Sequence, residues 1–318
     1  MNDNILDIYR KCHLCGRGCG TDRTSACGFC RESDQIRIAC ALLHKGEEPP
    51  ITGKNGSGTI FFTGCTLQCK FCQNHQISRG GIGKEVSVSE FAGICLDLQD
   101  AGAENINLVT GTQFIPSIAL GIAEAREKGL KIPVLWNSSG YETAEMLDIV
   151  NTFTDVYLPD LKTLNHHFAA VFFNASDYPE RAKESVIKMA ESKPLVFKDD
   201  KIISGTIIRH LVIPGYLEMT ERVLKWYSEN LKDKALLSVM FQYSPKAASP
   251  EYDDFPQRIL DRSEMDMVYS YLDEYGIEDG FIQEDEITEE WNPDFNKLSP
   301  FPGGTGRIVW HWKTGRNS

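Results

Sequence analysis

One stretch of this chain decides its interpretation, residues 64–74: Gly64-Cys65-Thr66-Leu67-Gln68-Cys69-Lys70-Phe71-Cys72-Gln73-Asn74. Its three cysteines follow a strand-like run, residues 58–63, at the spacing Cys-x3-Cys-x2-Cys. Three thiolates on so short a loop can bind three irons of a cubane iron–sulfur cluster, which normally takes four cysteine ligands. No fourth cysteine follows at ferredoxin spacing, so one iron keeps an open position, as a catalytic metal does. The alternatives are three buried structural thiols, or a zinc site without its fourth ligand.

Length and composition indicate a cytoplasmic enzyme. The 318 residues suffice for one barrel-sized domain with a small appendage. A hydrophobic content of 42% supports an ordinary core. The first residues carry no signal-peptide pattern, and no apolar run is long enough to span a bilayer, so we expect no membrane partner. The net charge of −12 makes nucleic acid an unfavourable partner.

A second group of cysteines lies at residues 12–30. It contains two Cys-x2-Cys pairs, residues 12–15 and 27–30, which suit zinc or a single iron. Four of its cysteines would equally suit a second iron–sulfur cluster: Cys12, Cys15, Cys19 and Cys30. We therefore predict a second metal site, with zinc and iron–sulfur both open. All ten cysteines fall within the first 95 residues, which favours metal binding in a reducing compartment over a disulfide framework.

The chain after the first cysteine loop alternates strand-like and helix-like segments, as parallel βα units require. The predicted strands cover residues 59–63, 105–110, 133–137, 155–158, 206–214 and 236–243. The predicted helices cover residues 87–101, with Ser87 or Ser89 as cap, 115–128, 144–151, 179–192, 218–230 and 263–275. The fold class is thus α/β, with a partial or full parallel (β/α) barrel.

Polar residues follow several of these strands, at the end of a barrel where active sites gather. One strand ends in Asn137-Ser138-Ser139, small polar residues that can hydrogen-bond a ribose or an amino group. The next ends in Asp160-Leu161-Lys162, a carboxylate and an ammonium from one turn. Arg209 and His210 lie inside an apolar strand. Because neighbouring side chains alternate in direction, we expect one of the two to face the barrel interior and the other the helices.

Taken together, these motifs resemble the radical S-adenosylmethionine (SAM) superfamily. The nearest resemblance is to pyruvate formate-lyase activating enzyme-like proteins, in the subgroup with an N-terminal cysteine module. It covers roughly residues 10–275 and rests on short motifs at residues 12–30, 47–50, 56–62, 65–74, 137–141, 157–162, 208–215 and 242–245.

This resemblance implies that Cys65, Cys69 and Cys72 bind a [4Fe-4S] cluster whose open iron chelates the methionine part of SAM. An electron from the cluster would then cleave the sulfonium and give a 5′-deoxyadenosyl radical. The resemblance also implies SAM-binding roles for further residues: Asn137, Ser138, Ser139, Asp160, Lys162 and Arg209. The superfamily often has a Gly-Gly-Glu segment for the amino group of SAM, and Gly111-Thr112-Gln113 stands in its place here.

Three functions are consistent with the sequence. The first is hydrogen abstraction from a protein partner, with installation of a glycyl radical and flavodoxin or ferredoxin as electron donor. The second is modification of a small molecule, RNA or another peptide. The third is an iron–sulfur electron-transfer or interaction protein that does not cleave SAM. We divide the chain into an N-terminal cysteine-rich module (1–50), a radical SAM barrel (51–278) and a C-terminal extension (279–318). For residues 308–313 of the extension two interpretations are open: a short strand on the barrel edge, or a lid that excludes solvent from the radical.

Overall fold

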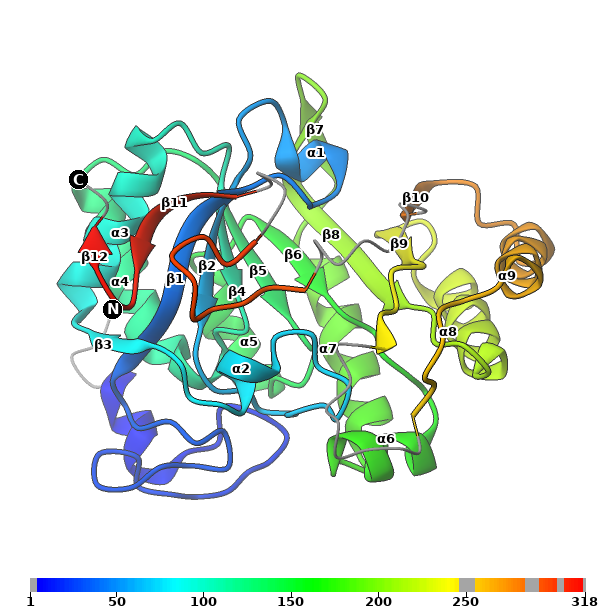
Figure 1. The fold of residues 1–318 in the computed structure, drawn as a ribbon, viewed down its shortest axis with the longest axis horizontal. Helices are drawn as coiled ribbons and strands as arrows, with labels where there is room; N and C mark the ends of the chain where they lie inside the picture. The colour runs from blue at the N-terminus through cyan, green and yellow to red at the C-terminus, as the bar shows by residue number, and fades with distance from the viewer. Residues whose placement is uncertain (1–4, 246–254, 284–291, 302–305, 317–318) are drawn as a thin grey trace.

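Parallel strands form most of the sheet in the computed structural model and reach one of its edges (Figure 1). The structure describes residues 5–245, 255–283, 292–301 and 306–316. The parallel strands, in spatial order, are β2 (Ser57–Phe62), β4 (Ile106–Val109), β5 (Val134–Ser138), β6 (Val156–Pro159), β8 (Lys201–Leu211), β9 (Leu236–Met240) and β10 (Gly280–Gln283). Their residues are largely buried on both faces, as expected of a parallel sheet covered on both sides.

Antiparallel strands extend this sheet beyond β2. Strand β1 (Ile36–His44) pairs with β2 on one side and with β11 (Gly306–His311) on the other, and β11 pairs with β12 (Gly315–Arg316). Two short strands lie off this path: β3 (Lys84–Val86) pairs with β1, and β7 (Val196–Lys198) pairs with β8. The described strands at the two edges, β10 and β12, do not pair with each other, so the α/β barrel is partial.

Six longer helices agree with the predicted ones to within one residue at each end. They are α3 (Val88–Asp100), α4 (Ile115–Glu127), α5 (Ala144–Asn151), α7 (Tyr178–Ser192), α8 (Leu217–Asn230) and α9 (Arg262–Glu274). Helix α3 begins at a capping box in which the Ser87 side chain accepts from the Glu90 backbone while the Glu90 side chain accepts from the Ser87 backbone. Ser87 is therefore the cap, and Ser89 lies inside the helix.

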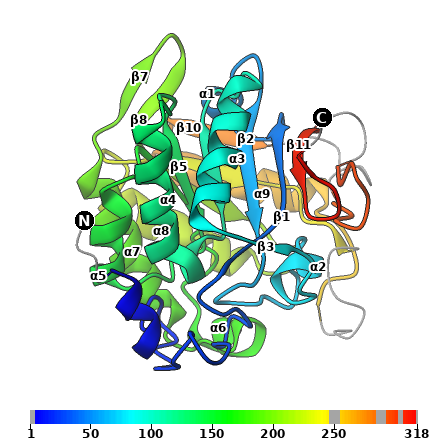
Figure 2. The same cartoon turned by 90° about the vertical axis from the view of Figure 1, so that its left-hand side faces the viewer.

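Five short helical segments escaped the sequence prediction. They are the 3-10 helices η1 (Ile5–Lys11) and η2 (Thr112–Phe114), and the α-helices α1 (Pro49–Thr52), α2 (His75–Ser78) and α6 (His166–Phe173). Most of them are a single turn, too short to show an apolar periodicity. In Figures 1 and 2, helices α3, α4, α5 and α7 cover one side of the parallel strands, and α2 lies on the other side.

The sheet takes strands from all three segments into which the sequence was divided. Strand β1 lies within residues 1–50, and β10 and β11 lie within residues 279–318. A strand is confirmed for residues 308–311, which lie in β11, but β11 is paired on both sides, by β1 and β12, and is not the edge of the sheet. Strand β1 was not predicted. Parts of the predicted C-terminal extension lie outside the described residues, and the three-unit division stays a prediction. Within the described ranges, no helix combines the length and apolarity needed to cross a bilayer.

Candidate active site

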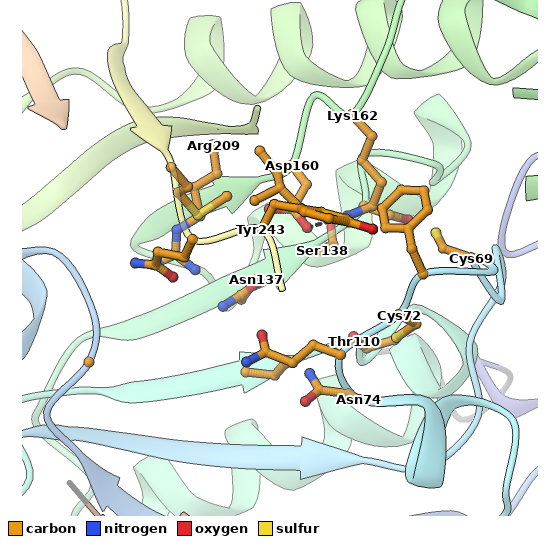
Figure 3. A pocket seen from close by; sticks show the side chains of 18 of the residues that line it. Cys69, Cys72, Asn74, Thr110, Asn137, Ser138, Asp160, Lys162, Arg209 and Tyr243 are labelled. Carbon is orange, nitrogen blue, oxygen red and sulfur yellow. Dashed lines mark hydrogen bonds and ion pairs between the residues drawn. The ribbon is translucent and has the colours of Figure 1, made fainter. Parts of the chain in front are cut away.

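A cavity of about 290 Å³ opens at the carboxyl ends of the parallel strands. Nine residues that the sequence singled out for the cluster and for SAM line this one cavity: Cys65, Cys69, Cys72, Asn137, Ser138, Ser139, Asp160, Lys162 and Arg209. Figure 3 shows labelled members of this set extending from neighbouring strand ends toward the same space. The order of the strands explains this, because parallel neighbours bring their carboxyl ends to one edge.

The loop with the three cysteines leaves β2 through two positions with positive φ. Gly64 has φ of 78°, and a Cβ atom there would lie 2.7 Å from the Cys30 carbonyl oxygen, so only glycine fits. Gln68 has φ of 52°, which turns the chain so that the Cys65 sulfur accepts from the backbone N–H groups of Leu67 and Gln68 at 3.4 and 3.5 Å. The loop therefore wraps around the Cys65 sulfur.

The three thiols of this loop have the chemistry that a cubane cluster needs. Each is close enough to the others to interact electrostatically, and the Cys72 sulfur accepts from Ser78 Oγ at 3.3 Å. Burial raises the pKa of Cys65 and of Cys69, so metal binding has to displace their protons. Among the described residues, no three His, Cys, Asp or Glu side chains converge as a single metal ion requires. A cubane does not require that convergence, because each thiolate binds its own iron.

Strands β4 and β5 contribute the polar groups nearest to this loop. Thr110, directly after β4, has φ of 60°, a strained conformation for a β-branched residue, and it lines the cavity. Ser138 Oγ accepts from the Gly140 backbone N–H at 3.2 Å, which fixes the turn after β5. Within the described part of the chain, the side chains of Asn137 and Ser139 have no hydrogen-bond partner. They are therefore available to a ligand in the cavity.

Strand β6 is followed by an ion pair in the cavity wall. Lys162 Nζ lies 2.6 Å from Asp160 Oδ2, and both side chains are partly buried. Burial by itself would lower the pKa of Lys162, but Asp160 and then Cys69 outweigh it and raise this pKa. Lys162 is therefore a permanent positive charge beside the cysteine loop, where a cluster with thiolate ligands would bring negative charge.

The two polar residues within β8 face opposite sides of the sheet, as predicted from their alternation. Arg209 lines the cavity, and its guanidinium binds the carboxylates of Glu47 and Glu48. His210 faces the helices, where Nδ1 bonds the Leu161 carbonyl oxygen at 2.8 Å and Nε2 bonds Thr220 Oγ1 at 3.0 Å. Because a carbonyl only accepts, Nδ1 carries a proton, while Thr220 Oγ1 can donate to Nε2 of a neutral ring. Burial lowers the His210 pKa to about 4.

The carboxylates that bind Arg209 were missed as site residues. Glu47 and Glu48 precede α1 and are both lining residues, with Glu48 only 6% exposed. Burial by itself would raise the pKa of Glu48, but the Arg209 charge outweighs it and lowers this pKa. The sequence motif at residues 47–50 was visible, but nothing in it indicates a partner on β8.

The turn after β4 contains Gly111-Thr112-Gln113, which stands where the superfamily often has a Gly-Gly-Glu segment. Thr112 Oγ1 donates to Glu142 Oε1 at 2.7 Å. The Gln113 amide donates to the carbonyl oxygens of Thr63 and Thr110 at 2.8 and 2.7 Å. Both side chains are buried away from the cavity, so within this turn Thr110 takes the position facing a ligand.

The far wall of the cavity comes from the segment after β9. Gln242 lines the cavity, and its amide Nε2 is buried without an acceptor among the described residues. A buried donor without a partner costs free energy, so this amide suits an acceptor on a ligand in the cavity. Phe71, between two cysteines of the loop, stacks on Phe255 with ring centroids 4.6 Å apart. This contact ties the cysteine loop to the same segment of the chain.

The N-terminal cysteines lie outside this cavity. Cys12, Cys15 and Cys30 are buried, and Cys19 and Cys27 are exposed. The dark blue N-terminal segment in Figure 1 lies below the sheet, at the same edge as α2 and the cysteine loop. Two other cysteines, Cys40 and Cys95, are fully buried in apolar surroundings and pack as core residues.

Known proteins resemble the chain in sequence. Residues 59–227, just over half of the chain, match the family model of the radical SAM superfamily. An uncharacterized protein of Methanocaldococcus jannaschii is 32% identical over 296 residues, which cover 87% of this chain and 81% of that protein.

Solved structures also resemble the chain, at lower similarity. A domain of a pyruvate-formate lyase-activating enzyme from Bacteroides vulgatus is 15% identical with a TM-score of 0.35, over 53% of this chain and 90% of that one. SuiB of Streptococcus suis bound to S-adenosylmethionine is 14% identical with a TM-score of 0.47, over 70% and 45%. Methylornithine synthase is 14% identical with a TM-score of 0.44, over 89% and 71%.

Proposed function

The chain belongs to the radical SAM superfamily, and we propose that it cleaves SAM reductively and abstracts a hydrogen atom from a substrate. The observation that carries the proposal is that the three loop cysteines and the six polar residues expected to bind SAM line one cavity. When held by Cys65, Cys69 and Cys72, a [4Fe-4S] cluster supplies the electron that breaks the sulfonium bond and yields the 5′-deoxyadenosyl radical.

The protein groups around the cluster loop have separate tasks in this proposal. Lys162 balances the negative charge of the thiolate-bound cluster, and Asp160 holds its ammonium in place. Asn137 and Ser139 have unused hydrogen-bonding groups that suit a ribose or an amino group. The buried Gln242 amide suits an acceptor on the ligand. Arg209 pairs with the carboxylates of both Glu47 and Glu48 and offsets one of their two negative charges, which makes it a positioning residue at the cavity wall.

For the substrate, we propose a protein partner on which a glycyl radical is installed, with flavodoxin or ferredoxin as the electron donor. The support is the resemblance of the motifs at residues 12–30, 47–50 and 157–162 to pyruvate formate-lyase activating enzyme-like proteins. We also propose that the enzyme works in the cytoplasm. All ten of its cysteines are free in the structure, as a reducing compartment keeps them.

The first experiment tests SAM cleavage. The full chain is reconstituted anaerobically with iron and sulfide, reduced with dithionite, and mixed with SAM, and 5′-deoxyadenosine is measured. We expect 5′-deoxyadenosine to form only with both reductant and SAM present. An iron–sulfur electron-transfer protein would reconstitute its cluster and form none, and this result would overturn the proposal.

The second experiment tests the product on the partner. The wild-type chain, or a variant with Cys65, Cys69 and Cys72 changed to Ala, is overproduced anaerobically in the natural host. Electron paramagnetic resonance of intact cells then searches for a stored glycyl radical. A glycyl signal that depends on the three cysteines supports activation of a protein partner. SAM cleavage without this signal would instead favour modification of a small molecule, RNA or another peptide.

A further inference from the structure

Four of the five N-terminal cysteines gather in one place. The Cys15 thiol lies within electrostatic reach of Cys12, Cys19 and Cys30, and Cys12 lies beside Cys19. Gly28 lies between two of these sulfurs, because a Cβ atom on it would be 3.5 Å from Cys30 Sγ and 3.6 Å from Cys19 Sγ. Cys27 is exposed, and none of these contacts involves it. The fold thus brings four of the five thiols close together and leaves Cys27 apart from them.

A buried positive charge lies against this group. The Arg23 side chain is fully buried, and Nη1 lies 3.9 Å from the Cys12 sulfur. Its other acceptors are neutral backbone oxygens of Glu32, Gln113 and Ser33. No described carboxylate forms an ion pair with it, and the Glu32 carboxylate lies 3.7 Å from Arg37 instead.

A guanidinium stays charged inside a protein, and a buried charge without an opposite charge is costly. The groups around Arg23 that can become anionic are the thiols of Cys12 and Cys30, the Tyr9 phenol and the Glu32 carboxylate. The Tyr9 hydroxyl is hydrogen-bonded to Ser117 Oγ, and burial raises its pKa to about 12, so it stays neutral. The Glu32 carboxylate pairs with Arg37, which leaves the two thiols as the anions that can face Arg23. They become permanent anions when they bind a metal, because the metal binds the thiolate. Arg23 is therefore a second observation, independent of cysteine spacing, that indicates a thiolate-bound metal.

We propose that Cys12, Cys15, Cys19 and Cys30 bind a metal centre with all positions filled by thiolate, either one zinc ion or an iron–sulfur cluster. Since no three of these sulfurs converge as a single ion requires, zinc binding needs small side-chain rotations, whereas a cluster places each thiolate on its own iron. The centre lies outside the SAM cavity and has a structural task.

That task is to hold the cysteine loop of the active site. Arg17 lies in the segment between Cys15 and Cys19, and its guanidinium donates to Thr66 O at 2.7 Å and to Leu67 O at 3.4 Å. The Gln68 side chain donates in return to Phe29 O at 2.7 Å. A metal that fixes the N-terminal segment therefore fixes the path of the loop that carries Cys65.

The test begins with the full chain in which Cys65, Cys69 and Cys72 are all changed to Ala. We expect about one zinc or about four irons per chain to remain after dialysis against a chelator, measured by elemental analysis. Zinc and iron distinguish the two kinds of centre. A variant with a native circular-dichroism spectrum and no bound metal would overturn the proposal.

The matched pair Cys19→Ala and Cys27→Ala sharpens this test, because both cysteines are exposed in the same module. We expect Cys19→Ala to lose retained metal by at least about tenfold, since even the loss of a residue supporting a ligand costs that much. Cys27→Ala should keep the metal. Equal retention by the two variants would contradict the proposed ligand set. If the triple variant does not fold, the same pair in the wild-type chain gives the comparison.

The proposed function and this inference can fail separately. The metal measurement uses a chain that cannot hold the SAM cluster, so its result does not depend on SAM cleavage. If wild-type protein forms 5′-deoxyadenosine but the triple variant holds no metal, only the N-terminal centre is refuted. If the triple variant holds metal and the wild type does not cleave SAM, only the proposed function is refuted.

Discussion

The two cysteine groups of this chain offer metals the same ligand in different surroundings. Cys65, Cys69 and Cys72 line a cavity together with polar groups from several strand ends. Cys12, Cys15 and Cys30 are buried outside that cavity, and the guanidinium of Arg23 lies against Cys12. The comparison teaches that the place of a cysteine group in the fold decides which kind of metal centre it suits. A group at the carboxyl ends of the strands suits a centre that accepts a substrate, and a group away from them suits a closed centre. The ligand type alone does not decide this.

The largest expected effect follows from removing the cavity cysteines. Changing Cys65, Cys69 or Cys72 to Ala should reduce 5′-deoxyadenosine formation to background, because no spare thiol lies at suitable spacing. Cys27→Ala should leave it unchanged, since this thiol is exposed and outside the cavity. Wild-type turnover in any one of the three cavity variants would refute the distinction between the groups.

A smaller effect is expected from the charges that only the cavity has. Lys162→Gln and Asp160→Asn should each weaken SAM binding by about tenfold to a hundredfold, the loss expected for a hydrogen bond to a charged group. The absorption spectrum of the cluster should not change. Lys201→Gln, which breaks a comparable pair with Glu104 at 2.5 Å outside the cavity, is the control. Equal SAM affinity in all three variants would make the Asp160–Lys162 pair merely structural.

The link between the two groups gives a third prediction. Arg17→Ala should speed hydrogen exchange of the amides at residues 65–72 by about thirtyfold, because two loop carbonyls lose their donor and each bond contributes about 1 kcal/mol. Arg31→Ala removes a similar exposed bond, to Arg79 O at 2.8 Å, without touching this loop. If both variants exchange at the wild-type rate, the groups are mechanically independent.

The smallest expected effect is a loss of stability at low pH, when the buried His210 becomes protonated. It sets the lowest pH at which the two cysteine groups can be compared. The His210 pKa is about 4 in the folded state against an ordinary 6.5, so protonation favours the unfolded chain. The stability from neutral His210 is present above pH 6.5 and is lost as pH falls toward 4, by about 2 kcal/mol at pH 5. The melting temperature should therefore fall below pH 6.5.

His210→Gln should flatten that fall, even if it lowers the melting temperature at pH 7. An identical pH dependence in the wild type and the variant would show that His210 does not titrate in this range. The metal content of both cysteine groups should accordingly be compared at or above pH 7.

Local patterns predicted much of this molecule. The βα alternation, the Ser87 cap and the opposite directions of Arg209 and His210 all depend on residues close together in the sequence. The convergence of nine site residues on one cavity followed from the shared edge of parallel strands. Their chemical roles remain proposals.

Contacts between distant segments could not be predicted in the same way. Glu48 binds Arg209 across 161 positions, and Arg17 reaches Phe173 across 156. The Gln113 amide turns toward backbone carbonyls, because a buried amide must satisfy its donors, and the sequence does not show which acceptors lie near. Strand β1 was missed because it precedes the alternating pattern and pairs antiparallel on both sides.

The central claim is that the open iron of a cluster on Cys65, Cys69 and Cys72 accepts SAM. The most direct measurement is the electron paramagnetic resonance spectrum of the reconstituted, reduced chain, recorded before and after addition of SAM. The same spectra are recorded for the variant with the three cavity cysteines changed to Ala. They show the signal of the N-terminal centre alone, which can then be told apart from that of the cavity cluster. The account predicts a cluster signal in the wild type that changes with SAM, and no SAM-dependent change in the variant. A wild-type cluster signal that SAM leaves unaltered would contradict it.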